Sequence, residues 1–316
     1  MDPNGFGADI AQRPETYRAL ATSLSAGSLD LARPDGPVVL LGMGSSRYAA
    51  GISARYLRGA GIGAHAEYST AELGSAPGRD VCVLAVSAGG GSAETSAAIQ
   101  PHIGISRVVA VTNDTGTEFA ASCDQVIDVL AGPEIGGVAC RSYSHTLAVL
   151  LQLASQWGAA DINIPAALQT AATACEHLLA TADEWLPDVA AALHGPNGTW
   201  VLAPADRLGS AEQSALMLRE GPRRPADACE TGDWSHVDVY LTKTLDYRAL
   251  LYTGSRWDGP ALEWMRQRES TWVAVGADVA GSAFVVRYPG HDDPIVAMLT
   301  ETIVAELVAQ RWWAGA

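Results

Sequence analysis

The chain has 316 residues, 48% hydrophobic and 17% charged, which is enough apolar material for about two domains of ordinary size. Its formal net charge of −15 argues against a nucleic-acid partner, because phosphate backbones are bound by basic surfaces. No apolar run reaches the ~18 residues of a membrane span. The first ten residues, M-D-P-N-G-F-G-A-D-I, lack the basic start and apolar core of a signal peptide, so we expect a cytoplasmic protein without membrane contact.

The cysteines are scattered along the chain and odd in number, at positions 82, 123, 140, 175 and 229. They form neither a C-x-x-C motif nor a cluster with histidines of the kind that holds zinc. We therefore expect reduced thiols buried as small apolar side chains, and neither a metal nor a cofactor.

In the first half of the chain, short apolar runs alternate with segments of helical spacing. The runs predict strands at 38–41, 81–86, 108–112 and 126–129. The helical spacing predicts helices at 48–57, 93–99 and 141–157. This alternation is typical of a parallel sheet with helices on both faces.

The second half repeats the theme after a predicted helix pair at 165–193. Strands are predicted at 200–203, 237–241, 249–252, 271–275 and 284–287, and helices at 212–219 and 294–313. The fold class is therefore α/β, with two doubly wound parallel-sheet domains, each a three-layer αβα sandwich. We expect an N-terminal arm (1–35), a first domain (36–160), a helical connector (161–194) and a second domain (195–316).

The segment V-S-A-G-G-G-S (86–92) lies where a predicted strand meets a predicted helix. Ligands of open parallel sheets bind beyond the carboxyl ends of the strands, where free backbone N–H groups suit an anion. Serine hydroxyls add neutral donors, and the pair Ser45–Ser46 stands at the equivalent junction after the first strand. The segment therefore predicts a phosphate cradle, with a merely small, tight turn as the alternative. A P-loop needs G-K-[ST], which the chain lacks, and Arg47 stands where a dinucleotide motif needs its third glycine.

Five segments, in order along the chain, resemble the sugar isomerase (SIS) family, and specifically the isomerase half of glucosamine-6-phosphate synthase and its stand-alone relatives. D-I-A-Q-R-P (9–14) resembles the family's E-I-x-E-Q-P entry, and G-M-G-S-S (42–46) resembles its C-G-T-S turn. V-S-A-G-G-G-S-A-E-T (86–95) resembles the phosphate loop S-Q-S-G-E-T. P-E-I-G-G-V-A-C-R-S-Y (133–143) and S-A-L-M-L-R-E (214–220) resemble T-E-I-G-V-A-S-T-K-A-F and G-A-L-K-L-K-E.

The resemblance implies a sugar-phosphate site in the first domain. By position, the groups that bind the phosphate would be Ser45, Ser46, Ser87, Gly89 and Ser92. Val138 and Cys140 would lie beside the sugar. Cys140 stands where the family usually has serine, and Ala88 and Gly89 replace glutamine and serine, so several donors are lost.

The resemblance also implies two catalytic residues. Glu220 ends A-L-M-L-R-E, and His236 follows sixteen residues later, as in the family's K-E…G-E-L-K-H pattern. Glu220 would be the proton-transfer base and His236 the ring-opening acid–base. The alternatives are a glutamate that caps a helix or pairs with Arg223 or Arg224, and a histidine that is an ordinary polar residue. In the family the histidine comes from a neighbouring subunit, which implies a homodimer.

Three departures narrow the expected activity. Met217 replaces a family lysine, the C-terminal tail of the synthase has no counterpart, and the loop after His236 reads V-D-V instead of G-P. We also expect no glutaminase domain. We therefore expect an enzyme that acts on a sugar or amino-sugar 6-phosphate by proton transfer next to C=O or C=N, as an aldose–ketose isomerase or a deaminase or deglycase. A catalytically inactive sugar-phosphate-binding sensor is the alternative, and a scaffold with a vestigial site is a third reading.

Overall fold

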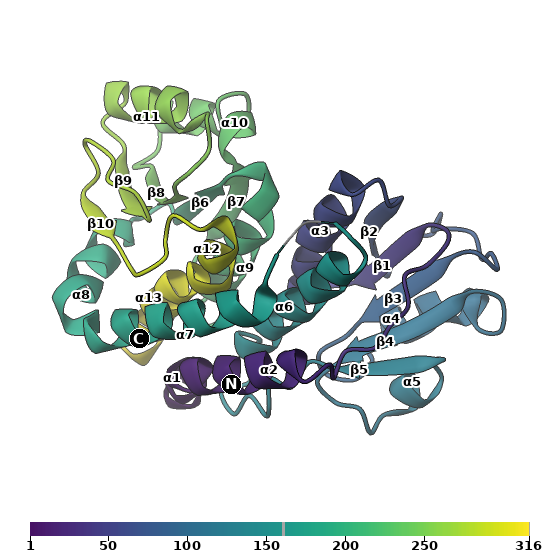
Figure 1. Cartoon of the computed structure of the whole chain (residues 1–316). Helices are drawn as coiled ribbons and strands as arrows, with labels where there is room; N and C mark the ends of the chain where they lie inside the picture. Colours follow the sequence, from purple (N-terminus) through teal and green to yellow (C-terminus); the bar gives the residue numbers. More distant parts are fainter. Residues whose placement is uncertain (160–161, 316) are drawn as a thin grey trace. The chain divides into compact units, whose positions relative to one another are not determined.

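The computed structural model describes residues 1–159 and 162–315 and falls into two compact units. The first-sheet unit comprises Thr16–Glu134 and Ala139–Leu168. The second-sheet unit comprises Met1–Glu15, Ile135–Val138 and Gln169–Ala316. Each is built on one five-stranded sheet with flanking helices, and the two are described separately (Figure 1).

The sheet of the first unit has the strand order β2-β1-β3-β4-β5, and every neighbouring pair is parallel. Its central strands are buried along their whole length, as a sheet covered on both faces requires. The strand order reverses between β1 and β3, so the crevice at their carboxyl ends is the switch point where ligands of such sheets bind. The strands are β1 (Val38–Gly42), β2 (Ala64–Tyr68), β3 (Cys82–Val86), β4 (Arg107–Thr112) and β5 (Gln125–Asp128).

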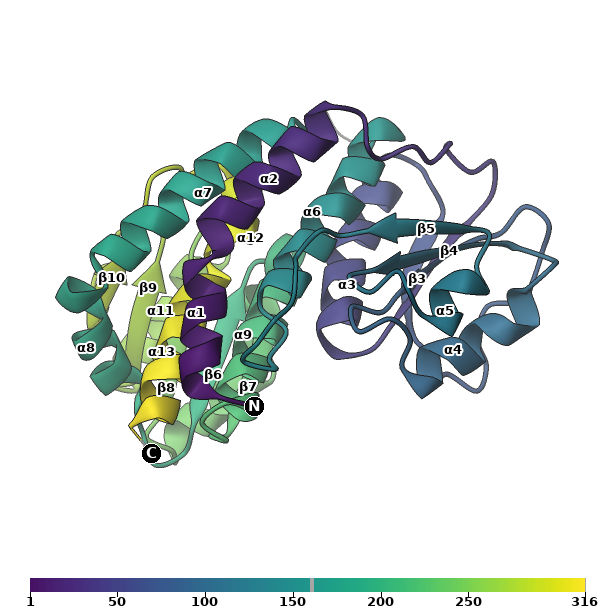
Figure 2. The ribbon, with the colours of Figure 1, turned by 90° about the horizontal axis from the view of Figure 1, so that it is seen from below.

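Helices cover both faces of this sheet (Figure 2). One face carries α3 (Gly44–Gly59), which packs on β1, β2 and the long buried helix α6 (Arg141–Gln156). The other carries α4 (Ala93–Ile99), η1 (Gln100–His102) and α5 (Glu118–Ala121). Most of α2 (Arg13–Ser25) belongs to this unit, where Tyr17 contacts His145 with ring centres 5.6 Å apart.

The second unit repeats the same topology, with the strand order β10-β9-β8-β6-β7. In this order β6 corresponds to β1, and β8 corresponds to β3. Every neighbouring pair is again parallel. The strands are β6 (Thr199–Ala203), β7 (Ala226–Glu230), β8 (Arg248–Tyr252), β9 (Thr271–Val275) and β10 (Phe284–Val286).

Helices flank both faces of the second sheet as well. A core of aromatic and aliphatic side chains, including Trp200, Trp234 and Tyr247, lies under α10 (Thr231–Trp234) and α11 (Asp258–Gln267). The opposite face carries α9 (Leu208–Glu220), which packs on α13 (Thr302–Ala314). The remaining elements are α1 (Pro3–Ala11), α7 (Ile164–Ala180), α8 (Ala182–Leu193), η2 (Ala205–Arg207), η3 (Asp238–Lys243) and α12 (Pro294–Thr300).

Two buried ion pairs fix the last helices of this unit. Arg13 and Glu306 lie 2.5 Å apart with no exposed side-chain surface. Arg207, after β6, lies 2.5 Å from Glu301 and also donates to the carbonyl of Thr253. A buried charge left without its partner destabilises a fold strongly, so these pairs anchor α13 to the start of α2 and the α12–α13 junction to the segment after β6.

The predicted fold class is confirmed, but several elements differ from the prediction. The strand predicted at 237–241 is wrong, because η3 (Asp238–Lys243) occupies this segment. The alternation V-D-V-Y-L resembles a strand, but in the turn of η3 Val239 and Leu241 pack against the core while Val237 and Tyr240 are 49% and 61% exposed. The single helix predicted at 294–313 is divided into α12 and α13 at Glu301.

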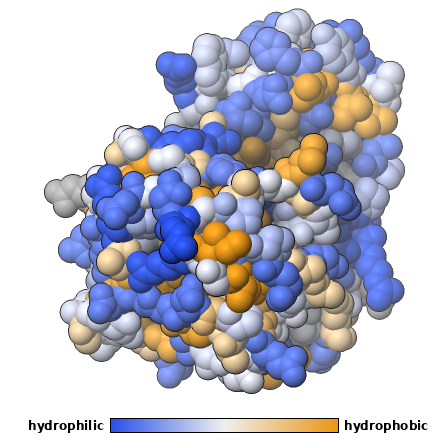
Figure 3. Space-filling model, turned by 90° about the vertical axis from the view of Figure 1, so that its right-hand side faces the viewer, coloured by the Kyte–Doolittle hydropathy of each residue, from blue (hydrophilic) through white to orange (hydrophobic). Residues whose placement is uncertain are grey.

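The face of the molecule seen in Figure 3 is mostly hydrophilic, with apolar residues in small separate groups. In the described part of the chain, no helix combines the length and the hydropathy that a membrane crossing requires.

Candidate functional site

The glycines of the 87–92 loop follow from the path of its backbone. Gly90 and Gly91 have φ values of 77° and 113°, which side chains of L-residues rarely tolerate. A Cβ at Gly90 would lie 2.4 Å from Thr117 Cγ2, and one at Gly91 would lie 2.4 Å from Phe119 Cβ. Gly89 differs, because it is exposed and its Cβ would meet no atom within 4 Å. Gly90 and Gly91 therefore require glycine, whereas Gly89 leaves the backbone open to solvent.

Several hydrogen-bond donors of this loop are available to a ligand. The Ser87 hydroxyl accepts from the amides of Gly91 (2.9 Å) and Ser92 (3.2 Å), which uses both of its lone pairs and leaves its proton to donate. In the described structure, no acceptor is hydrogen-bonded to the Gly89 amide. Because α4 has only seven residues, the loop's own hydroxyls and amides carry more weight here than a helix dipole.

A chain of three hydroxyls, which was not predicted, anchors the end of the loop. Ser92 Oγ accepts from the Thr95 amide at 3.2 Å and donates to Thr95 Oγ1 at 3.1 Å. Thr95 Oγ1 lies 3.1 Å from Ser69 Oγ, directly after β2. Thr95 and Ser69 are 1% and 8% exposed. Their hydrogen bonds tie the loop after β3 to the end of β2, so Ser92 is held in a fixed position.

The second predicted hydroxyl pair lies at the same edge of the sheet. Ser45 and Ser46 are half-buried in the first turn of α3, and β1, which precedes them, is hydrogen-bonded to β3. The N-cap residue, Met43, provides no side-chain cap. Because β1 and β3 are neighbours, the first turn of α3 and the 87–92 loop lie at the same edge of the sheet, where the phosphate cradle is predicted.

The two residues expected beside the sugar, Val138 and Cys140, are 2% and 0% exposed. Near Cys140, the Glu134 carboxylate accepts from the amides of Cys140 (2.7 Å), Arg141 (2.6 Å) and Ser142 (3.1 Å). An internal anion therefore occupies the N-terminus of α6. This role of Glu134 was not predicted, although an acidic residue shortly before a predicted helix is a signal that could have indicated it.

Glu220 is half-buried at the last residue of α9. The alternative partner Arg224 donates instead to the Gly195 carbonyl and lies over the Trp312 ring, 5.1 Å from its centre. Met217, which stands where the family has lysine, is fully buried, with its sulfur 3.5 Å from Gln213 Nε2. This position belongs to the core of the second-sheet unit.

His236 is exposed in the turn that follows α10. Trp234 anchors this turn, because its buried indole donates to the Tyr247 hydroxyl at 2.7 Å. Glu220 precedes the start of β7 and His236 follows its end. The strand between them has five residues and spans about 13 Å.

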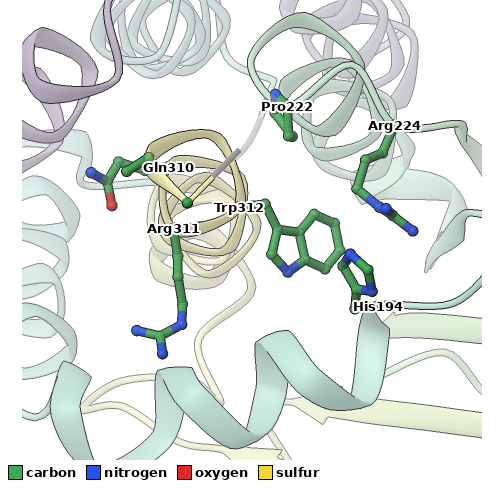
Figure 4. Close-up of a pocket in the computed structure, with 8 residues that line it drawn as sticks. His194, Pro222, Arg224, Gln310, Arg311 and Trp312 are labelled. Atoms are coloured by element: carbon green, nitrogen blue, oxygen red, sulfur yellow. The ribbon is translucent and has the colours of Figure 1, made fainter.

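Two surface cavities have linings that include neither Ser87 nor Ser92. One of about 550 Å³ beside β2 is lined by Glu67, Glu72 and Glu94 and repels anions. The other, of about 680 Å³, lies near the amino ends of β6 and β7, where His194 and Arg224 flank Trp312 (Figure 4). The amino ends of the strands are the opposite edge from the one where ligands of such sheets bind.

The described residues contain no group of three or more histidine, cysteine or acidic side chains placed to hold a metal. The cysteines are free thiols. Burial raises the pKa of Cys82 to about 11 and that of Cys175 and Cys229 to about 12, so these thiols stay protonated at neutral pH.

No protein-family model matches the chain. The chain is 26% identical over 247 residues to a glutamine–fructose-6-phosphate aminotransferase (isomerizing) from Aeropyrum pernix, covering 74% of this chain and 38% of the relative. It is 30% identical over 166 residues to the protein of the same name from Symbiobacterium thermophilum, covering 50% and 27%. The chain thus spans well under half the length of the curated relatives that it matches.

Solved structures share the fold over nearly the whole chain. The C-terminal domain of glucosamine-fructose-6-phosphate aminotransferase from Francisella tularensis superposes with a TM-score of 0.81 at 16% identity, covering 96% of this chain and 94% of that one. Tagatose-6-phosphate ketose/aldose isomerase from Escherichia coli gives 0.81 at 15% identity, covering 98% and 92%. Glucosamine-6-phosphate deaminase from Thermotoga maritima gives 0.73 at 15% identity, covering 98% and 94%. Together with the sequence matches, these structures confirm the predicted resemblance to the SIS family and its two-domain fold.

Proposed function

We propose that this chain, a relative of the SIS family in sequence and fold, is a phosphosugar-processing enzyme whose substrate phosphate binds the 87–92 loop. The observation that carries the proposal is the arrangement of donors at the switch point of the first sheet. The Ser87 proton, the Gly89 amide and the first turn of α3 share that edge. The proteins of similar sequence and fold are named for reactions of sugar phosphates.

The proposed chemistry is proton transfer between adjacent carbons of a sugar or amino-sugar 6-phosphate. Such a reaction needs a base and a group that opens the sugar ring. Glu220 is the proposed base, and His236 is the proposed ring-opening acid–base. Because Glu220 and His236 lie at opposite ends of β7, we propose that the reacting pair comes from two chains of a homodimer.

An aldose–ketose isomerase and a deaminase or deglycase remain two forms of this proposal, since both begin with loss of a proton next to C=O or C=N. The buried Met217 places no amine at the position of the family lysine. Nitrogen transfer of the synthase type is therefore disfavoured relative to isomerisation or deamination.

A sugar-phosphate sensor without catalysis is the second candidate. Two losses of donors favour it: Ala88 and Gly89 replace glutamine and serine of the family loop, and Met217 replaces lysine. A sensor of this kind would bind its ligand through Ser87 and Ser92 without exchanging any proton.

Solvent-deuterium exchange separates the two candidates. The full chain is incubated in D₂O with fructose 6-phosphate, glucosamine 6-phosphate or a fructosamine 6-phosphate, and deuterium uptake at the sugar is followed by NMR. The enzyme predicts uptake that is lost in Glu220→Gln and kept in Glu184→Gln, an exposed glutamate on α8. Thermal stabilisation by the ligand without uptake would identify a sensor. The proposal would be overturned if none of the three compounds gave either deuterium uptake or thermal stabilisation.

A further inference from the structure

Arg47 lies where a positive charge is locally unfavourable. It follows Ser46 in the first turn of α3, and its amide donates to the Met43 carbonyl at 3.4 Å. The amino end of a helix already carries a partial positive charge, which favours an anion bound at the same turn.

The guanidinium of Arg47 is held by two aromatic rings. Its Cζ lies 4.5 Å from the centre of the Tyr68 ring and 5.3 Å from that of Tyr48. Tyr68 is the last residue of β2, and the next residue is Ser69, the start of the hydroxyl chain that reaches Ser92. Consecutive residues at the end of β2 therefore fix both the Arg47 cation and the end of the phosphate loop.

The charge around this edge explains why a cation matters. A phosphate monoester carries about −1.5 to −2 charges at neutral pH. The formal net charge of the chain is −15, and Glu67, Glu72 and Glu94 line the neighbouring cavity. The loop donors are neutral hydroxyls and amides, which satisfy phosphate oxygens without cancelling this repulsion. A guanidinium satisfies phosphate oxygens and also reduces the repulsion, because it is positively charged and its planar N–H groups match two phosphate oxygens.

We propose that Arg47 is the charged ligand of the phosphate site, and that Tyr68 positions it there. The inference rests on the proposed function and deepens it, because it makes the site selective for dianionic phosphate monoesters over neutral sugars.

Calorimetric titrations of the full chain with inorganic phosphate, fructose 6-phosphate and fructose test the role of Arg47. In Arg47→Ala the Kd for both phosphates should rise about ten- to a hundred-fold, as expected for loss of a charged hydrogen bond. The dependence of Kd on salt should also become weaker. Arg47→Lys keeps the charge but loses the planar pair of N–H donors, so its Kd should lie between those of the wild type and Arg47→Ala. Arg55→Ala is the matched control, because Arg55 is exposed on the same helix about two turns further along.

The positioning role of Tyr68 has its own readout. Tyr68→Phe keeps the ring face and should bind phosphate as the wild type does. Tyr68→Leu should raise Kd about two- to five-fold, the range of an exposed cation–π contact, and should reduce the salt dependence. A Leu variant that matches the Phe variant in both quantities would contradict this role.

The outcomes separate this inference from the proposed function. If Ser87→Ala combined with Ser92→Ala abolishes phosphate binding while Arg47→Ala changes neither Kd nor its salt dependence, the inference is overturned and the phosphate site stands. If the wild-type chain binds neither inorganic phosphate nor fructose 6-phosphate, both fail together. Thermal melts of each variant establish that it is folded, and Arg47→Lys replaces Arg47→Ala if the latter is not.

Discussion

Glu220 and His236 stand at opposite ends of the edge strand β7, one before its first residue and the other after its last. The intervening strand spans about 13 Å, more than the separation expected of a base and an acid that act on adjacent carbons of one sugar. We therefore expect a reaction that uses both side chains to take them from two copies of the chain. The sequence spacing of sixteen residues matches the resembled family, but only the fold explains why that spacing separates the two groups.

Complementation between inactive variants tests this shared site. Glu220→Gln and His236→Asn should each lose deuterium exchange, because each removes one member of every acid–base pair. Mixing and re-associating the two variants should restore up to about a quarter of the wild-type rate, since half of the random dimers would hold one intact pair. Recovered rate is measured after mixed refolding, with each variant alone as the control.

Absence of recovery from samples shown by size-exclusion chromatography and tagging to contain mixed dimers would contradict the shared site. Activity in a monomeric preparation of the wild-type chain would contradict it equally.

The glycines of the phosphate loop should differ sharply in their tolerance of a methyl group. Gly90→Ala and Gly91→Ala each combine a positive φ with a Cβ placed 2.4 Å from a neighbouring side-chain atom. We expect each to lower the free energy of unfolding by about 1–3 kcal/mol. Gly89→Ala, with open space around its Cβ, is the internal control and should change stability by less than about 0.5 kcal/mol. Urea unfolding measures all three, and equal effects at the three positions would show that the loop follows a different path.

Stability should depend on pH through Glu301. Burial raises the pKa of Glu301 from 4.5 to about 7, although the nearby Arg207 opposes the rise. Between these two values the folded chain holds a proton that the unfolded chain has released. The free energy of unfolding should therefore fall as pH rises through this window, by at most about 1.4 kcal/mol per pH unit, and the loss should be complete above the folded pKa.

Chemical unfolding of the wild type and Glu301→Gln at pH values from 5 to 8 measures this contribution. The amide does not titrate, so the stability of the wild type relative to the variant should decline with pH. Two parallel curves would mean that Glu301 keeps an ordinary pKa in the folded chain. Glu184→Gln, at an exposed position on α8, controls for the general effect of removing a carboxylate.

The central strands of each sheet were predictable because burial on both faces requires a continuous apolar run in the sequence. The apolar runs of β1 and β3 lie along strands buried over their whole length. Two of the edge strands, β2 and β7, were missed for the converse reason. A-H-A-E-Y in β2 and A-D-A-C-E in β7 are only partly buried, so polar residues of low β-propensity are tolerated there. Register and edge strands depend on the assembled sheet, which a local pattern does not contain.

The candidate site was likewise only partly predictable from the sequence. The glycines and serines of the 87–92 loop were recognisable from their position after a strand. Ser69 and Thr95 were not, because they are 26 residues apart and become neighbours only when β2 and the loop after β3 meet at one sheet edge. The ring contacts of Arg47 with Tyr68 likewise join the start of a helix to the end of a different strand.

The most direct measurement is a crystal structure of the chain with fructose 6-phosphate bound. The account predicts a phosphate group within hydrogen-bonding distance of Ser87 Oγ, the Gly89 amide and Ser92 Oγ, with the Arg47 guanidinium beside it. A phosphate bound instead in the cavity of His194, Arg224 and Trp312, with the 87–92 loop in contact only with protein side chains, would contradict it.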